Sequence, residues 1–125
     1  MAETHPSITA AGVDHVRLSY LYLDAGDLDG YASLLHEDVH LVLPGSPTGR
    51  SRDDAMRLAG ERPRPHGTHG LFKVIADGDC VVAVGRYNPA SPNDTPGHDF
   101  ADVFTLSDNA LLMSQRRFRC EPPAD

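Results

Sequence analysis

The chain has 125 residues, of which 40% are apolar and 23% are charged; this composition is typical of one globular domain with its own core. Its formal net charge of −7 disfavours nucleic acids and anionic membranes as partners, because both bind basic surfaces. No apolar run is long enough to span a membrane and the start does not resemble a secretory signal, so we expect a cytoplasmic protein. We expect a single domain over residues 1–125, with a core of about residues 8–119 and short flexible ends.

The first half of the chain predicts three helices and one strand. Apolar residues recur at helical spacing over residues 7–24, and a Gly-containing turn at 24–27 then ends this helix and caps a short second one that runs to about residue 35. From residue 38 to 43 the period changes to two, which predicts a strand. Residues 51–59 begin with a capping pattern and are expected to form a third helix.

The stretch HEDVH, from His36 to His40, matches the H-E-x-x-H pattern of zinc proteases. That pattern binds zinc only on a helix, where both histidines share one face. Here we expect the motif to cross from the end of a helix into a strand. On a strand the two positions would lie roughly 13 Å apart, too far for one ion. We therefore expect no metal site.

The second half of the chain predicts an antiparallel meander. Four apolar segments are separated by Gly- or Asn-containing turns and by one Pro/Gly-rich connection. These expected strands are residues 69–76, 80–87, 99–106 and 111–120. Helices gathered at one end of a sheet-forming chain indicate an α+β fold.

This order of elements resembles the nuclear transport factor 2-like superfamily, and in particular its SnoaL-like branch. The segments that carry the resemblance are YLYLDAGDLDGYASLLHEDVHLVLPG (20–45), TGRSRDDAMR (48–57), ADGD (76–79) and FADVFTLSDN (100–109). The resemblance implies a cone-shaped α+β barrel in which a strongly curved antiparallel sheet wraps around N-terminal helices and a deep, mostly apolar pocket. It also implies a homodimer. Asn109-Ala110-Leu111 departs from the usual Gly-Lys-Ile of the last hairpin.

Asp102 is the first candidate for catalysis. Alternation places it on the same face as Phe100 and Phe104. A carboxylic acid buried among aromatic rings favours its neutral form and can then donate a proton. The resemblance implies that this position serves as an acid or base in SnoaL-like cyclases and binds an oxyanion in ketosteroid isomerases. An exposed strand residue is the alternative.

Asp24 and His69 form the second candidate. In dehydratases and dehydrochlorinases that look similar, an aspartate and a histidine at these places form a dyad. A carboxylate that accepts from one imidazole nitrogen fixes the tautomer and makes the other nitrogen more basic. The alternatives are that Asp24 only ends a helix and that His69 only begins a strand.

A steroid isomerase is disfavoured, because the resemblance places its general base on Leu43 and its oxyanion tyrosine on Ser19. Tyr20 is expected to pack near Val16. We interpret Arg117 as lying on the face opposite Arg116 and Arg119. The residues expected to contact a substrate are Tyr20, Leu41, Leu43, Tyr87, Phe100, Phe104 and Arg117.

The sequence contains no phosphate-binding loop, no nucleophile elbow and no cofactor fingerprint. We therefore expect a cofactor-free enzyme, a cyclase, isomerase or dehydratase, that acts on a small, mostly apolar carbonyl compound such as a polyketide. In this hypothesis Asp102 is the general acid or base, and His69 oriented by Asp24 is its partner. The alternative is a ligand-binding or dimerisation module without catalysis.

Overall fold

The computed structural model describes residues 6–120, so both ends that were expected to be flexible lie outside the described residues. The elements in chain order are α1 (Pro6–Ala25), α2 (Leu28–Ser33), β1 (Leu35–Val42), α3 (Arg52–Gly60), β2 (Thr68–Asp77), β3 (Cys80–Asn88), β4 (His98–Leu106) and β5 (Leu112–Cys120). Within this range no helix is long and apolar enough to cross a membrane.

The zinc-like motif lies entirely on a strand. The short helix α2 ends at Ser33 and β1 begins at Leu35, earlier than the sequence pattern predicted. His36 and His40 therefore both belong to β1 and not to two different elements. The helical geometry that lets the two histidines of H-E-x-x-H share one ion is absent from this segment.

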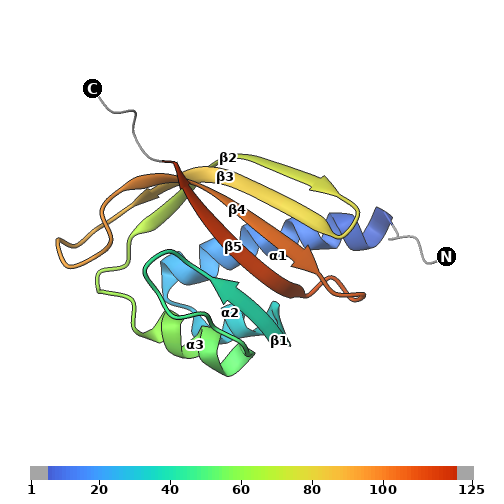
Figure 1. Ribbon diagram of the computed structural model, residues 1–125, viewed down its shortest axis with the longest axis horizontal. Coiled ribbons are helices and arrows are strands. Elements are labelled where there is room, and N and C mark those ends of the chain that lie inside the picture. The colour runs from blue at the N-terminus through green and yellow to red at the C-terminus, as the bar shows by residue number, and fades with distance from the viewer. Residues whose placement is uncertain (1–5, 121–125) are drawn as a thin grey trace.

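The five strands form one open, curved sheet in the order β1-β5-β4-β3-β2 (Figure 1). The pairs β2–β3, β3–β4 and β4–β5 are antiparallel, as the meander predicted. The pair β1–β5 is parallel, and within residues 6–120 the sheet does not close into a barrel. The predicted α+β fold with a curved sheet around N-terminal helices is thus confirmed, with one parallel edge strand.

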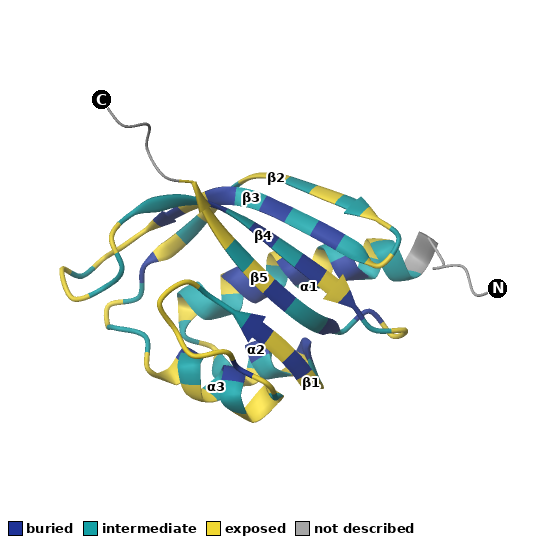
Figure 2. Ribbon diagram, viewed as in Figure 1, coloured by how far each residue is buried: buried dark blue, intermediate teal, exposed yellow. Residues whose placement is uncertain are grey.

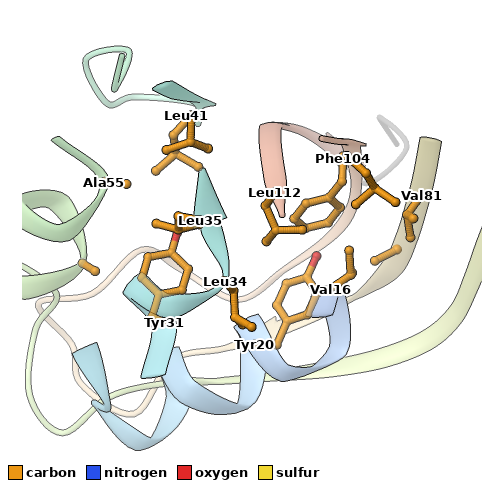
Figure 3. Packing of buried hydrophobic residues seen from close by; sticks show 14 of the residues in the cluster. Val16, Tyr20, Tyr31, Leu34, Leu35, Leu41, Ala55, Val81, Phe104 and Leu112 are labelled. Carbon is orange, nitrogen blue, oxygen red and sulfur yellow. The ribbon is translucent and has the colours of Figure 1, made fainter. Parts of the chain in front are cut away.

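The inner face of the sheet packs against α1, which crosses beneath the strands (Figure 1). Buried residues alternate with more exposed ones along β3 and β4 (Figure 2), as expected for a sheet with one covered face. Val16 and Tyr20 of α1 meet Val81 and Phe104 in this core (Figure 3). The same alternation fixes which side chains of β4 and β5 point inward.

Two turns position the ends of neighbouring elements. Gly26 has a φ of 72° after α1, and Asp27 caps α2 by accepting a hydrogen bond from the Gly30 amide. In the last hairpin Ala110 has a φ of 65°, a conformation that glycine adopts more readily. The departure from the usual Gly-Lys-Ile therefore falls on the turn and away from the interior of the sheet.

Candidate functional site

A cavity of about 310 Å³ lies between the inner face of the sheet and the helices. Side chains from all three helices and all five strands contribute to its walls. Its apolar lining includes Leu23, Leu41, Leu43, Ala55, Leu58 and Pro63. Its charged and ionisable lining includes Arg62, His69, Asp94, His98, Arg117 and Arg119. The lining is therefore mixed, and charged groups are more prominent than the mainly apolar pocket expected from the family resemblance.

Asp24 and His69 are in direct contact. The Asp24 Oδ1 atom lies 2.6 Å from His69 Nδ1, and Oδ2 accepts a hydrogen bond of 2.8 Å from the His69 backbone amide. Both side chains are largely buried, with 16% of Asp24 and 6% of His69 exposed. A carboxylate only accepts, so Nδ1 carries the proton and Nε2 keeps its lone pair. The dyad implied by the family resemblance is thus geometrically complete.

The second ring nitrogen of His69 has no protein partner. His69 lines the cavity while Asp24 does not, and Nε2, the nitrogen that does not contact Asp24, makes no hydrogen bond within residues 6–120. Burial lowers the pKa of His69 below its usual value of 6.5 and outweighs the opposing effect of Asp24. Nearby Arg62 and Arg117 lower this pKa further. His69 is therefore neutral at physiological pH and competent to accept a proton.

Local structure brings the two partners of this dyad together. Asp24 lies in the last turn of α1, and His69 is the second residue of β2. Gly67, just before β2, packs so closely on Tyr87 that a side chain there would overlap the Tyr87 hydroxyl. The Tyr20 and Tyr87 rings flank the imidazole, with centroids 5.0 Å and 4.9 Å from it. The imidazole is thus held on several sides.

Asp102 is fully buried and is surrounded by hydrogen-bond donors. Its Oδ2 atom accepts from the Tyr20 hydroxyl at 2.6 Å and from Gln115 Nε2 at 3.1 Å. Arg117 binds both oxygens, with Nε 2.8 Å from Oδ1 and Nη2 2.8 Å from Oδ2. Four hydrogen bonds therefore converge on one buried carboxyl group, and two of them come from a guanidinium that binds it side-on.

Asp102 thus holds Arg117 rather than facing a substrate. It does not line the cavity, whereas Arg117, Tyr20 and Gln115 do. Asp102 occupies the Nε–Nη2 edge of the guanidinium, so the Nη1–Nη2 edge is left for other acceptors. The guanidinium carbon also lies 4.1 Å from the centre of the Phe100 ring. The network therefore fixes the guanidinium of Arg117, which lines the cavity, and leaves one of its edges without a partner in Asp102.

The residues expected to contact a substrate divide into two groups. Tyr20, Leu41, Leu43, Tyr87 and Arg117 line the cavity. Phe100 and Phe104 do not, and both are fully buried. This corrects the expectation that they form the cavity wall. The reason is that Tyr20 and Arg117 cover them: Phe104 packs edge-on against Tyr20, and Phe100 lies beneath Arg117.

The positions of the arginines also require a correction. Arg117 and Arg119 lie on the same face of β5, because they pair with the inward-facing Asp102 and Phe100. Arg116 pairs with Val103 and lies on the outer face. The period of two along a strand puts positions two apart on one face, so the sequence already contained this signal.

Other cavity residues carried little sequence signal. Arg62 belongs to a proline-rich loop, yet it donates to the Leu23 carbonyl oxygen, and Nη2 lies 3.9 Å from Asp24 Oδ1. Asp94 comes from the long β3–β4 connection and accepts a hydrogen bond from the Tyr87 hydroxyl. His98, at the start of β4, also lines the cavity. A local sequence pattern does not show that such loop residues line a cavity, because their position depends on the tertiary fold.

Solved structures of similar shape share the fold. A protein from Kribbella flavida, provisionally named a ketosteroid isomerase, is 21% identical with a TM-score of 0.77. The match covers 94% of this chain and 85% of that chain. An NTF2-like protein of unknown function from Burkholderia pseudomallei is 18% identical, with a TM-score of 0.77 and coverages of 88% and 91%. A provisionally named polyketide cyclase from Sinorhizobium meliloti is 13% identical, with a TM-score of 0.72 and coverages of 84% and 94%.

At these identities the likeness shows the fold and not the activity. A search among curated proteins finds no match. The family profile described as the SnoaL-like domain matches residues 6–112, which is most of the chain. The elements α1 to β4 and the Asp24–His69 contact all lie within the matched residues. The chain belongs to the family of SnoaL-like domains.

Proposed function

We propose that this protein is a cofactor-independent acid–base enzyme, a cyclase, isomerase or dehydratase, that acts on a small carbonyl compound in the 310 Å³ cavity. The observation that carries the proposal is the contact of 2.6 Å between Asp24 Oδ1 and His69 Nδ1, which leaves Nε2 unprotonated on the cavity side. A neutral imidazole held in this way is a suitable general base.

His69 takes the proton in this proposal. Nε2 removes a proton from the carbon next to the substrate carbonyl, and the electron pair moves onto the carbonyl oxygen to form an enolate. In an isomerisation the substrate carries a second double bond conjugated with the enolate, and the same imidazolium returns the proton to the far carbon of that bond. In a dehydration the enolate expels a hydroxyl group from the β-carbon, and the imidazolium protonates this group so that it leaves as water. In a cyclisation the enolate carbon attacks a second carbonyl group, and that oxygen receives the proton.

Arg117 stabilises the negative charge that develops on the oxygen. Its Nη1–Nη2 edge supplies two donors that are already fixed by Asp102, so little reorganisation accompanies the reaction. Burial lowers the pKa of Arg117, but the contacts with Asp102 and Tyr20 together outweigh burial and raise this pKa, so the guanidinium stays charged. Asp102 is then a positioning residue, and not the proton donor that the sequence pattern suggested.

The test is exchange of the protons next to a ketone with solvent deuterium. We would incubate 1-tetralone with the protein in D₂O and follow the loss of the proton signals by NMR. The wild-type protein should accelerate exchange, and His69→Gln should lower the catalysed rate by roughly 10²–10⁴-fold. His40→Gln, an exposed histidine of β1, is the matched control and should exchange like the wild type.

The same experiment distinguishes an enzyme from a binding module without catalysis. If the wild-type protein binds 1-tetralone but exchanges its protons no faster than buffer, the site is a binding module without catalysis. If His69→Gln exchanges as fast as the wild type, the proposed base is wrong.

The proposal includes a cytoplasmic homodimer, formed through the outer face of the sheet. That face carries Phe72, Ile75 and Phe118, which are 66%, 50% and 49% exposed, and a dimer that covered them would remove this apolar surface from water. The mass in solution, measured by light scattering, should be that of two chains. Phe118→Glu should yield a monomer, and a monomeric wild-type protein would contradict this part of the proposal.

A further inference from the structure

Two arginines follow one another along the inner face of β5. Arg117 and Arg119 both line the cavity, and their partners across the sheet are Asp102 and Phe100. Residues two apart on a strand are separated by roughly 6.5 Å. Arg117 is 11% exposed, whereas Arg119 is an exposed residue. The cavity therefore has one guanidinium inside and a second one, one strand repeat away, at its mouth.

The two guanidinium groups differ in their counter-charges. The charge of Arg117 is matched by Asp102, with which it shares two hydrogen bonds. Arg119 makes no ion pair within residues 6–120. The two carboxylates that line the cavity have other contacts, since Glu61 lies 3.8 Å from Arg57 and Asp94 accepts bonds from the Tyr87 hydroxyl and the Thr95 amide. Arg119 is thus a cationic group at the cavity that has no carboxylate partner within residues 6–120.

Arg62 adds positive charge beside the Asp24–His69 pair, with Nη2 3.9 Å from Asp24 Oδ1. This Nη2 atom is buried and has no hydrogen-bond partner within the described part of the chain. His69 itself is neutral in the site described above. A neutral, apolar ligand would cover these guanidinium groups without giving them a partner, which costs free energy. An anionic ligand would not have this cost.

We propose that the substrate is a keto acid, whose carboxylate binds Arg119 at the mouth of the cavity while its carbonyl oxygen binds the free edge of Arg117. This inference rests on the proposed function for the role of Arg117, and it adds the substrate class. The spacing of the two arginines favours molecules in which the two oxygen groups stand at opposite ends of one ring. A guanidinium binds a carboxylate through two parallel hydrogen bonds, which gives direction as well as charge.

The experiment compares two probes that differ only in charge. 1-Tetralone-6-carboxylate carries its ketone and its carboxylate at opposite ends of one aromatic ring, and 1-tetralone-6-carboxamide replaces the carboxylate by a neutral group of the same shape. Dissociation constants would be measured by calorimetry at neutral pH. The wild-type protein should bind the acid about tenfold more tightly than the amide, as for a hydrogen bond between charged groups.

Two variants with the same change in net charge locate the contact. Arg119→Gln should reduce the preference for the acid to less than about threefold. The preference that remains would come from the screened attraction of the other arginines. Arg116→Gln changes the same strand on its outer face and should keep the full preference. Equal binding of acid and amide by the wild type, a preference that survives Arg119→Gln, or one that Arg116→Gln also removes would overturn the inference.

Failure of the inference is distinguishable from failure of the proposed function. The binding measurement needs no turnover, so a preference for the acid without proton exchange would contradict only the catalytic proposal. Exchange of 1-tetralone without any preference for the acid would contradict only the substrate class. If neither probe binds to the wild-type protein, the cavity is not a site for keto acids and the inference is wrong.

Discussion

Two carboxylates behind the cavity wall, Asp24 and Asp102, are used differently. Asp24 contacts one side chain closely, the His69 imidazole, and leaves the second nitrogen of that ring unbonded. Asp102 accepts four hydrogen bonds and leaves a guanidinium edge unbonded. In each case the carboxylate is behind the cavity wall, and the group that it holds forms part of that wall.

The difference between the two regions lies in what each presents to the cavity. The Asp24 region presents a lone pair, which can accept a proton. The Asp102 region presents N–H groups, which can stabilise negative charge but cannot take up a proton. A base and a set of donors on the same cavity are the two groups that proton abstraction next to a carbonyl requires. The predictions below test whether the two regions are independent in this way.

The largest effect should come from removing the Asp102 carboxylate. Asp102→Ala leaves the charge of Arg117 buried without its partner, so we expect the free energy of unfolding to fall by about 3–5 kcal/mol. Urea denaturation measures this change. Asp99→Ala on the same strand is the matched control, because its partner Arg86 is 48% exposed and such a pair contributes about 1 kcal/mol or less. Equal effects of the two substitutions would show that the charge of Asp102 is not buried.

A smaller effect is expected from deleting one of the four donors. Tyr20→Phe removes the hydroxyl that donates to Asp102 Oδ2 and should cost about 1.5–3 kcal/mol, the range for a hydrogen bond to a charged group. Tyr22→Phe on the same helix is the control, since Tyr22 is only partly buried and is not among the donors to Asp102, and it should change stability by less than about 0.5 kcal/mol. A Tyr20→Phe variant as stable as Tyr22→Phe would mean that the hydroxyl is dispensable to the network.

Gly85→Ala should affect the Asp24 region and spare the Asp102 region. A methyl group at Gly85 would overlap the Gly70 carbonyl oxygen on β2, next to His69. The strands must separate, at a cost of about 1–3 kcal/mol, and the NMR signals of the His69 ring should shift. Gly70→Ala is the control, because its nearest neighbouring atom would lie 3.9 Å away. If both variants are equally stable, β2 moves more easily than the contact implies.

The sequence indicated the position of Asp102 and the pairing of Asp24 with His69, but not the residues that bind Asp102. Alternation along residues 100–104 placed Asp102 on the face of Phe100 and Phe104, and the structure leaves all three residues fully buried. The resemblance to SnoaL-like proteins suggested the pair Asp24–His69, and the structure joins the two. Each of these inferences needed only the position of a residue within its own element or a match to known motifs.

The partners of Asp102 could not be predicted in this way. They come from α1 and β5, and they meet Asp102 only because β4 and β5 pair with Asp102 opposite Arg117. A shift of this register by one residue would turn Arg117 to the outer face. The sequence pattern indicated the burial of Asp102 but not its hydrogen bonds to Tyr20, Gln115 and Arg117, because these partners come from distant elements.

The smallest effect is the dependence of stability on pH that His69 causes. Its sign shows whether burial or Asp24 has the larger effect on the pKa of His69. Burial lowers the pKa of His69 below 6.5 and opposes Asp24, which raises it. The unfolded chain therefore binds a proton at a higher pH than the native protein does, so the contribution of His69 to stability is complete above pH 6.5 and declines as the pH falls toward the lowered pKa.

The measurement is the difference in the free energy of unfolding between the wild type and His69→Gln, determined by urea denaturation from about pH 7.5 to about pH 5. Because glutamine does not titrate, this difference should shift in favour of the variant as the pH falls. The difference between the wild type and His40→Gln, at an exposed histidine, should stay nearly constant. A shift in favour of the wild type would mean that Asp24 prevails over burial and that His69 is already protonated near neutrality. An imidazolium cannot accept a proton, so that result would remove the base from the cavity while leaving the donors of the Asp102 region in place.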